Sequence, residues 1–223
     1  MPQWRLDTQL QTLILGNSTT ELPAVLYWGS ALPAQERLCE ITQASVNTGT
    51  LDTTAKISIC PQHSDSFPGQ VGMLLRDAQG HTLWTKFALE SEAQNSENLS
   101  LIFSDQGLGL QYQLLIGIDN TNNLFTFSAK VTSEQAIYMD WLAAPVLPAP
   151  QNSQHSLEFS GPWCGEFKIN QVPWSPGART RENRLGRTSY EHFPELIILA
   201  LMLTITLAKL MRFTTVGQVG TRC

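Results

Sequence analysis

LGLQYQLLIGIDNTNNLFTFSAKV, residues 108–131, is the stretch that decides the fold, because two apolar runs flank one polar turn. Residues 124–131 alternate between apolar and polar side chains, which is the period of a strand with one buried face. Asp, Asn and Thr fill residues 119–123 between the runs and favour a turn. The stretch therefore predicts antiparallel β structure.

Shorter runs of the same kind extend outward from this stretch. They are Thr12–Leu15, Ala24–Trp28, Ala55–Cys60, Val71–Arg76, His81–Phe87 and Leu101–Phe103. Asp77–Gly80 predicts a turn, and Ala55, Ile57 and Ile59 are expected on one face of a strand. The only helix expected in this part of the chain is a short one around Ser133–Ala136.

The regular spacing of strands and turns predicts an all-β fold, a large antiparallel β-sandwich or supersandwich. Because an isolated pair of strands is marginal in water, we expect about ten or more strands to share its sheets. Residues 147–153 are rich in Pro and polar residues and are expected to connect two sheets. We expect residues 1–198 to form the sandwich domain and residues 199–223 to form an aberrant or tail segment.

The composition limits the function classes. Hydrophobic residues make up 42% of the 223, which is enough for a core, whereas charged residues make up only 15%. The formal net charge of −5 argues against nucleic acid as a partner. The amino-terminal segment has no positive start followed by an apolar run, so we expect a cytoplasmic protein.

The four cysteines predict neither a metal site nor a disulfide framework. Cys39, Cys60, Cys164 and Cys223 have no C-x-x-C spacing, and no pair of histidines has the spacing of metal ligands. We expect buried free thiols, no metal and no cofactor.

The chain ends in an unusual apolar segment, LIILALMLTITLA, residues 196–208. A membrane span needs about 20 residues, so we do not expect a membrane partner. Three interpretations stay open: a short tail anchor, a helix packed against the sandwich, and a segment that was not selected as part of this fold.

A second unusual segment, residues 159–187, is called the strap below. It reads FSGPWCGEFKINQVPWSPGARTRENRLGR and combines two Trp, three Pro, four Gly and four Arg. Pro173, Pro176 and Gly177 argue against a continuous helix or a central strand. The strap is either a solvated basic loop or a patch that pairs with an acidic partner domain.

Several blocks together resemble the N-terminal domain of bacterial α-galactosidases of glycoside hydrolase family 36. The blocks are Leu22–Gly29, Leu51-Asp52, Phe67–Gly69 with Trp84, Tyr138–Leu142 with Leu147-Pro148, Gly161–Phe167, Trp174, Arg181–Arg184, and Gly186–Ser189 running to Pro194. They are in the family's order over roughly residues 4–198.

The resemblance implies a many-stranded sandwich that precedes a catalytic (β/α)8 barrel. The barrel carries two Asp residues, a nucleophile and a general acid/base, in a retaining mechanism that needs two carboxyls about 5–5.5 Å apart. Its substrates are terminal α-galactosides such as melibiose and raffinose, and the full-length family is expected to form homo-oligomers. No residue of this chain matches a catalytic Asp of the family, so we expect this chain alone to be inactive.

The resemblance ends near Ile198, which suggests a frameshift. When residues 209–221 are back-translated and read from the third base of each codon, the degenerate codons permit a string like the family's next strand. The hypothesis is that residues after about Ile198 are out of frame and that the chain is a truncated reading of a longer gene.

The resemblance also gives site residues. The polar loop 62–67 is the candidate for reaching a neighbouring subunit's sugar pocket, with Asp65 and Phe67 adjacent to substrate. The residues expected at the interface between sandwich and barrel are Trp163, Glu166, Trp174, Arg181, Arg184 and Arg187. Trp28, Trp163 and Trp174 could instead stack on sugar rings, and Glu166 could pair with His192 or Arg187. Asp119 and Asp140 are expected to be structural.

A competing hypothesis is a stand-alone carbohydrate-binding or assembly module, which would bind glycans without hydrolysing them.

Overall fold

The computed structural model describes residues 2–17, 21–44, 57–65, 69–143, 145–150, 152–162, 164–175, 177, 179–181, 192–200 and 209–214. Its strands are β1 (Gln3–Asp7), β2 (Gln11–Gly16), β3 (Ala24–Ser30), β4 (Met73–Arg76), β5 (Ala88–Gln94), β6 (Asn98–Asp105), β7 (Leu110–Asp119), β8 (Leu124–Ser133), β9 (Tyr138–Leu142), β10 (Ser153–Ser160), β11 (Lys168–Pro173), β12 (His192–Ala200) and β13 (Lys209–Thr214). A helix, α1 (Leu38–Ala44), and a 3-10 turn, η1 (His63–Asp65), complete the described elements.

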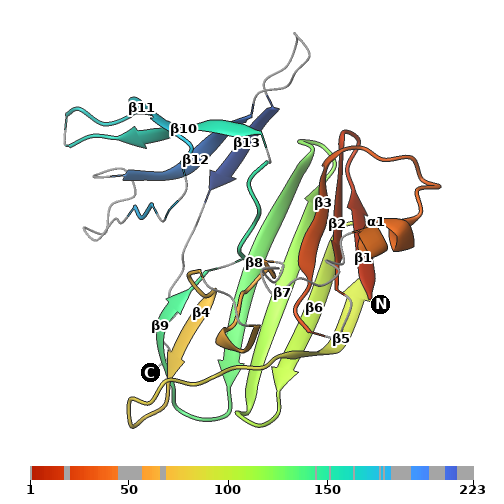
Figure 1. The fold of residues 1–223 in the computed structure, drawn as a ribbon, viewed down its shortest axis with the longest axis vertical. Coiled ribbons are helices and arrows are strands. Elements are labelled where there is room, and N and C mark those ends of the chain that lie inside the picture. Colours follow the sequence, from red (N-terminus) through yellow and green to blue (C-terminus); the bar gives the residue numbers. More distant parts are fainter. Residues whose placement is uncertain are drawn as a thin grey trace. The chain divides into compact units, whose positions relative to one another are not determined.

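The chain divides into two compact units, residues 1–148 and 149–223 (Figure 1). In the described residues, the first unit holds three sheets, in the orders β1-β2-β3, β5-β6-β7-β8 and β4-β9. The described part of the second unit holds one sheet, in the order β11-β10-β12-β13. The pairings between these strands are antiparallel, so the predicted all-β, antiparallel class is confirmed.

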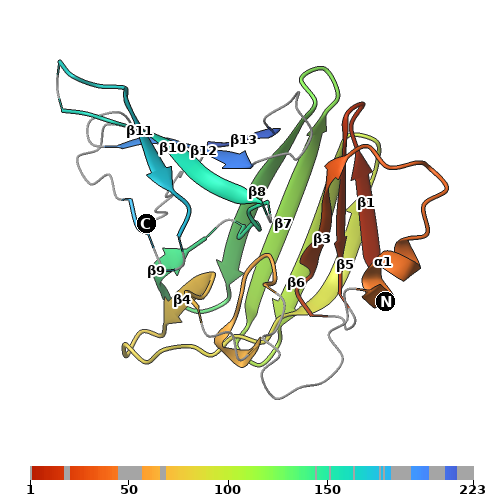
Figure 2. The same cartoon turned by 45° about the horizontal axis from the view of Figure 1, so that its top comes forward.

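The first unit is a sandwich in which the sheet β1–β3 lies against one face of the sheet β5–β8 (Figures 1 and 2). Burial alternates without a break along β6, and the same period runs through most of β7. The inward rows therefore come together in one core, whose largest fully buried side chains include Phe87, Phe103 and Tyr112. As the sequence predicts, β7 and β8 pair across the turn at 119–123.

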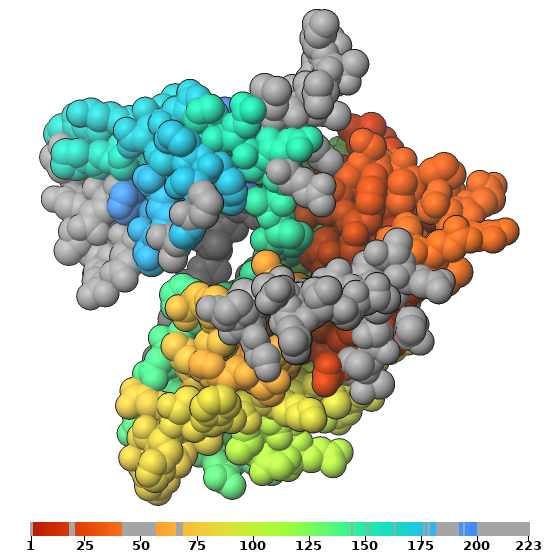
Figure 3. Space-filling model, viewed as in Figure 1, coloured from red at the N-terminus to blue at the C-terminus, as the bar shows by residue number. Residues whose placement is uncertain are grey.

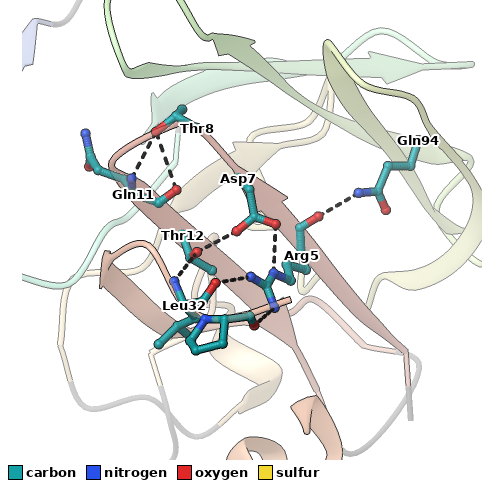
Figure 4. A network of polar contacts seen from close by, with 8 residues as sticks. Arg5, Asp7, Thr8, Gln11, Thr12, Leu32 and Gln94 are labelled. Atoms are coloured by element: carbon teal, nitrogen blue, oxygen red, sulfur yellow. Dashed lines mark hydrogen bonds and ion pairs between the residues drawn. The ribbon is translucent and has the colours of Figure 1, made fainter. Parts of the chain in front are cut away.

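Polar contacts fasten the amino-terminal edge of this sandwich (Figure 4). The Arg5 guanidinium donates hydrogen bonds to the carbonyls of Leu32 (2.7 Å) and Pro33 (2.9 Å), and its Nε lies 2.7 Å from the Asp7 carboxylate. The Gln94 side chain donates to the Arg5 carbonyl at 2.7 Å, which links the end of β5 to β1. The hydrogen bond from Gln94 therefore joins the two sheets at this edge, and those from Arg5 hold residues 32–33 against β1.

Three local predictions are wrong. Ser133 is the last residue of β8, and residues 134–137 form no helix, because the Glu134 amide bonds to the Gly109 carbonyl (3.0 Å) and keeps the chain extended along β7. Over residues 57–60 the expected strand is reduced to a single bridge between Ala24 and Ser58. Ile57 is 45% exposed and Ile59 only 1%, so they do not share a face.

The strand β4 shows the limit of local reasoning. The turn expected at Asp77–Gly80 is present, and its Gly80 has a φ of 90° that favours glycine. Residues 81–87, however, form no strand, and β4 pairs with β9, which lies more than sixty residues later. Across the turn the expected pairing is reduced to one bridge, between Arg76 and Thr82, and to a hydrogen bond from the Leu83 amide to the Leu75 carbonyl (2.9 Å).

The carboxy-terminal segment is extended where it is described. Leu196–Ala200 belong to β12, not to a helix, because they pair with β10 on one side and β13 on the other. β12 continues through Ile198, the boundary expected from the sequence, and residues 201–208 lie outside the described residues. No helix in the described ranges is long and apolar enough to cross a membrane.

The three described cysteines are free, but only one is buried. Cys60 is 1% exposed, whereas Cys39 and Cys164 are exposed, so the expectation of buried thiols is wrong for those two. Burial, with a smaller contribution from the charge of Asp65, raises the pKa of the Cys60 thiol to about 12. Cys223 lies outside the described residues.

We predict that Cys60 does not react with a thiol reagent in the folded chain at pH 8, because its thiol is both enclosed and protonated. Cys60→Ala should leave the number of fast-reacting thiols unchanged, and Cys39→Ala should lower it by one. Absorbance from a disulfide-exchange reagent gives the count, and a lower count in Cys60→Ala would contradict the prediction.

Candidate functional site

The described part of the polar loop, residues 62–65, follows a segment that is held by several hydrogen bonds. The Ile59 amide donates to the Pro23 carbonyl (2.8 Å), and the Ile59 carbonyl accepts from Val146 (2.7 Å). Gln62 is buried, and its side-chain carbonyl accepts from the Phe87 amide at 3.1 Å. Three separate segments, at Pro23, Phe87 and Val146, therefore hold the chain that leads into η1.

Asp65 closes η1 by a local contact. Its Oδ2 accepts a hydrogen bond from the Gln62 amide at 3.1 Å, while the Asp65 amide donates to the Gln62 carbonyl at 3.1 Å. Burial raises the pKa of the Asp65 carboxyl, and the nearby Glu21 charge adds to this, against hydrogen bonds from Gln62 and Ser64 that lower it. A partly buried carboxyl with a raised pKa is a feature of functional sites.

An aromatic pair lies beside this turn. The His63 and Trp84 rings are 5.0 Å apart at 41°, and Trp84 is 67% exposed. An exposed Trp ring offers an apolar face that suits the C–H surface of a sugar. The pair brings together a loop residue and a residue twenty-one positions later, a contact that the sequence reasoning missed. The available signal was Trp84 itself, a large aromatic within residues 81–87, which were expected to form a strand.

The remaining loop residue, Phe67, lies outside the described residues, as does Asp52. Within the described residues, no group of three or more His, Cys, Asp or Glu side chains could hold a metal ion. The described part of the site therefore consists of Asp65 and of the pair formed by His63, from the same turn, and Trp84.

The strap of the second unit is attached to its own sheet. Arg179 lies 2.9 Å from the Glu158 carboxylate of β10, and Glu158 is only 4% exposed. The Ser156 hydroxyl lies 3.4 Å from the other oxygen of that carboxylate. Arg181 donates to the Glu195 carbonyl of β12 at 3.1 Å. Two of the strap's cations thus bind inside this unit.

Glu158 was missed by the sequence reasoning. Its burial could have been predicted from the strand period. Ser156 and Glu158 are two residues apart in β10, and both face its buried side. A charged residue on an inward row needs a cation, and the strap is rich in arginine.

The edge strand β11 and the residues on either side of it leave apolar side chains in solvent. Phe167, Ile169 and Trp174 are 56%, 65% and 45% exposed, and Figure 3 shows the atoms of this region, in cyan to light blue, uncovered. β11 pairs with β10 along one edge. An exposed apolar edge of this kind is typical of an interaction surface.

The turn that leads into β11 is tight. A Cβ on Gly161 would lie 1.9 Å from the Gly165 carbonyl oxygen, and Cys164 and Phe167 have φ values of 64° and 59°. Such conformations are uncommon for residues other than glycine and cluster at functional segments.

Of the other residues expected at the interface, only Glu166 lies within the described residues. Glu166 is half-buried and has no ion pair with any described residue, so the expected pairing with His192 is not found. Trp163, Arg184 and Arg187 lie outside the described residues.

Three residues weighed as site candidates have structural contacts. Trp28 packs edge-on against Phe125 and Phe127 and donates from its ring nitrogen to Gln11 at 3.1 Å. Asp140 makes a two-pronged ion pair with Arg76, whose hydrogen bonds lower the pKa of the Asp140 carboxyl. Asp119 accepts hydrogen bonds within its own turn. The predictions of structural roles for Asp119 and Asp140 are confirmed.

Comparison with known families decides the assignment. The sequence model of the glycosyl hydrolase family 36 N-terminal domain matches residues 21–204, most of the chain. The chain belongs to this family. The resemblance read from its Trp, Arg and Pro blocks is confirmed.

Relatives of this family 36 domain are much longer than the chain. The chain is 26% identical over 199 residues to an α-galactosidase of Escherichia coli, and the match covers 87% of this chain and 27% of that protein. The family 36 domain therefore spans about a quarter of the length of this curated relative.

Solved structures show the same fold. A family 36 α-galactosidase of Geobacillus stearothermophilus, AgaA A355E in complex with 1-deoxygalactonojirimycin, matches with a TM-score of 0.74 at 16% identity, over 89% of this chain and 32% of that one. An α-galactosidase of Lactobacillus brevis matches with a TM-score of 0.74 at 17% identity, over 89% and 31%.

We predict that Asp65→Asn stabilises the family 36 domain at pH 7. A raised pKa means that the folded state binds the proton more tightly than the unfolded chain, so ionisation costs stability as pH rises through the pKa. The gain in melting temperature should shrink as pH falls through the raised pKa of Asp65 and vanish below the ordinary Asp pKa of about 3.9. A lower melting temperature for Asp65→Asn at pH 7 would contradict the assignment.

We predict that Arg179→Met destabilises the domain by about 1–3 kcal/mol, because it leaves a buried carboxylate without its cation. Glu158→Gln in the same chain should restore part of the loss. Arg37→Met, which removes an exposed pair with Glu40, is the matched control and should change stability by less than about 0.5 kcal/mol. Chemical denaturation measures all three, and equal losses for the two arginines would refute the buried-pair interpretation.

Proposed function

We propose that this chain serves an α-galactosidase as its non-catalytic N-terminal domain, and that the two catalytic carboxylates lie in a barrel outside this chain. The observation that carries the proposal is the family match over residues 21–204, combined with a share of only 27% of the E. coli enzyme. The substrate class proposed for the whole protein is terminal α-galactosides, since a matched Geobacillus structure is in complex with raffinose.

The two sites have separate proposed roles. Asp65, together with Phe67 and the pair of His63 and Trp84, is proposed to border the sugar pocket of a neighbouring subunit in a homo-oligomer. The exposed aromatic edge at Phe167 and Trp174 is proposed to pack on the barrel, with Trp163, Glu166, Arg181, Arg184 and Arg187. Buried aromatic anchors are the usual source of binding energy at such interfaces.

A cytoplasmic location is proposed on the state of the cysteines. Cys39 and Cys164 are exposed and free, and exposed free thiols persist in a reducing compartment.

The proposal predicts that the chain alone releases no nitrophenol from p-nitrophenyl α-galactoside. In a chimera, residues 1–198 replace the matched segment of the E. coli enzyme; the chimera should be active, and the enzyme that lacks the segment should not. In the chimera, Trp174→Ala should lower the active fraction, whereas Trp84→Ala should raise KM. Turnover by the chain alone, or a chimera no better than the deletion, would overturn the proposal.

A further inference from the structure

The outer face of the sheet β6–β8 carries neutral polar side chains near the β7–β8 turn. In the register of the sheet, Gly117 of β7 lies between Asn98 of β6 and Thr126 of β8. In the next row, Leu115 lies between Ser100 and Ser128. The face therefore offers amide and hydroxyl groups around one exposed leucine.

This part of the face is hollowed into a groove of about 610 Å³. Glu97, Asn98, Leu115, Gly117, Thr126 and Ser128 line it, together with the turn at residues 119–121. Its volume is within the range of about 300–1,000 Å³ that is typical of small-molecule sites.

Two features give the groove its form. At Gly117 a Cβ would lie 2.5 Å from the Thr126 hydroxyl oxygen, so a larger residue would displace that hydroxyl. The turn at its end is held by Asp119, which accepts from the amides of Thr121 and Asn122 (both 2.9 Å) and from the Asn122 side chain (2.8 Å). These hydrogen bonds hold the pKa of Asp119 below its ordinary value, and the one from the Asn122 side chain contributes most. The turn at the end of the groove is therefore held by its own hydrogen bonds.

We propose that this groove binds an uncharged oligosaccharide. Amides and hydroxyls match the donors and acceptors of sugar hydroxyls. Leu115, 42% exposed, offers an apolar contact to the C–H face of a pyranose ring. Of the two carboxylates in the lining, that of Asp119 is used by its turn, which leaves Glu97 to accept from sugar hydroxyls.

The lining also excludes other ligands. It contains no Lys or Arg among the described residues, so a phosphate or a nucleic acid has no cation to bind there. The groove lies on the sandwich of the first unit and does not involve Asp65 or the strap, so the inference does not rest on the proposed function.

Calorimetric titration of the full chain with raffinose, maltotriose and soluble galactomannan tests the proposal. We expect millimolar binding of at least one of these saccharides. Thr126→Val should weaken it by about three- to tenfold, since it removes one hydrogen bond at constant shape. Thr132→Val is the matched control: Thr132 is exposed on the same face of β8 but outside the groove, so its binding should stay within about twofold. Thermal unfolding confirms that both variants fold.

Amide chemical shifts measured with the same saccharides locate the site independently of any variant. They should move at residues 97–98, 115–117 and 126–128. The proposal is overturned if none of the three saccharides binds at millimolar concentrations, if the two threonine variants weaken binding equally, or if a saccharide that binds shifts only amides outside these ranges.

Discussion

The rest of the first unit depends on the burial of two facing rows of side chains. Leu13 and Leu15 of β2 face the row of β6 and β7 that contains Phe103 and Tyr112, and all four are fully buried. Each sheet has one apolar face, so neither is stable in water without the other. The demand is strong enough to bury the Tyr112 hydroxyl without a partner among the described residues and to raise its pKa.

That core also sets the position of the candidate site. A Cβ on Gly72 would lie 2.8 Å from both the Cα and the Sγ of Cys60, so the segment that leads into η1 lies directly on the chain at Gly72. The Gly72 amide bonds to the Pro61 carbonyl at 2.7 Å. Core packing at Cys60 and Gly72 therefore determines where η1 begins, and with it the positions of Asp65 and His63 at or near the surface.

The sequence predicted what depends on local pattern. The alternation in residues 124–131 gave the strand and its face, and the turn residues at 119–123 gave the connection. It could not predict the pairing of β4 with β9 or the stacking of His63 on Trp84, because both depend on which segments meet after the sandwich closes. At residues 57–60 the alternation was real, but backbone contacts with two separate segments, at Pro23–Ala24 and at Val146, replaced the expected ladder.

The carboxylates of the first unit are mostly committed to structure. Asp105 accepts from the amides of Lys86 and Leu108, Asp77 accepts from the amides of Gln79 and His81, and Asp140 is held by Arg76. A retaining glycosidase instead needs two carboxylates that face a substrate. This use of the carboxylates is compatible with the non-catalytic role proposed above.

The strap also makes structural contacts within its own unit. Arg179 and Arg181 bind acceptors of their own sheet, whereas Phe167, Ile169 and Trp174 stay in solvent. A partner at this edge would gain more from burying aromatic and aliphatic surface than from pairing with those two arginines, which are already bound.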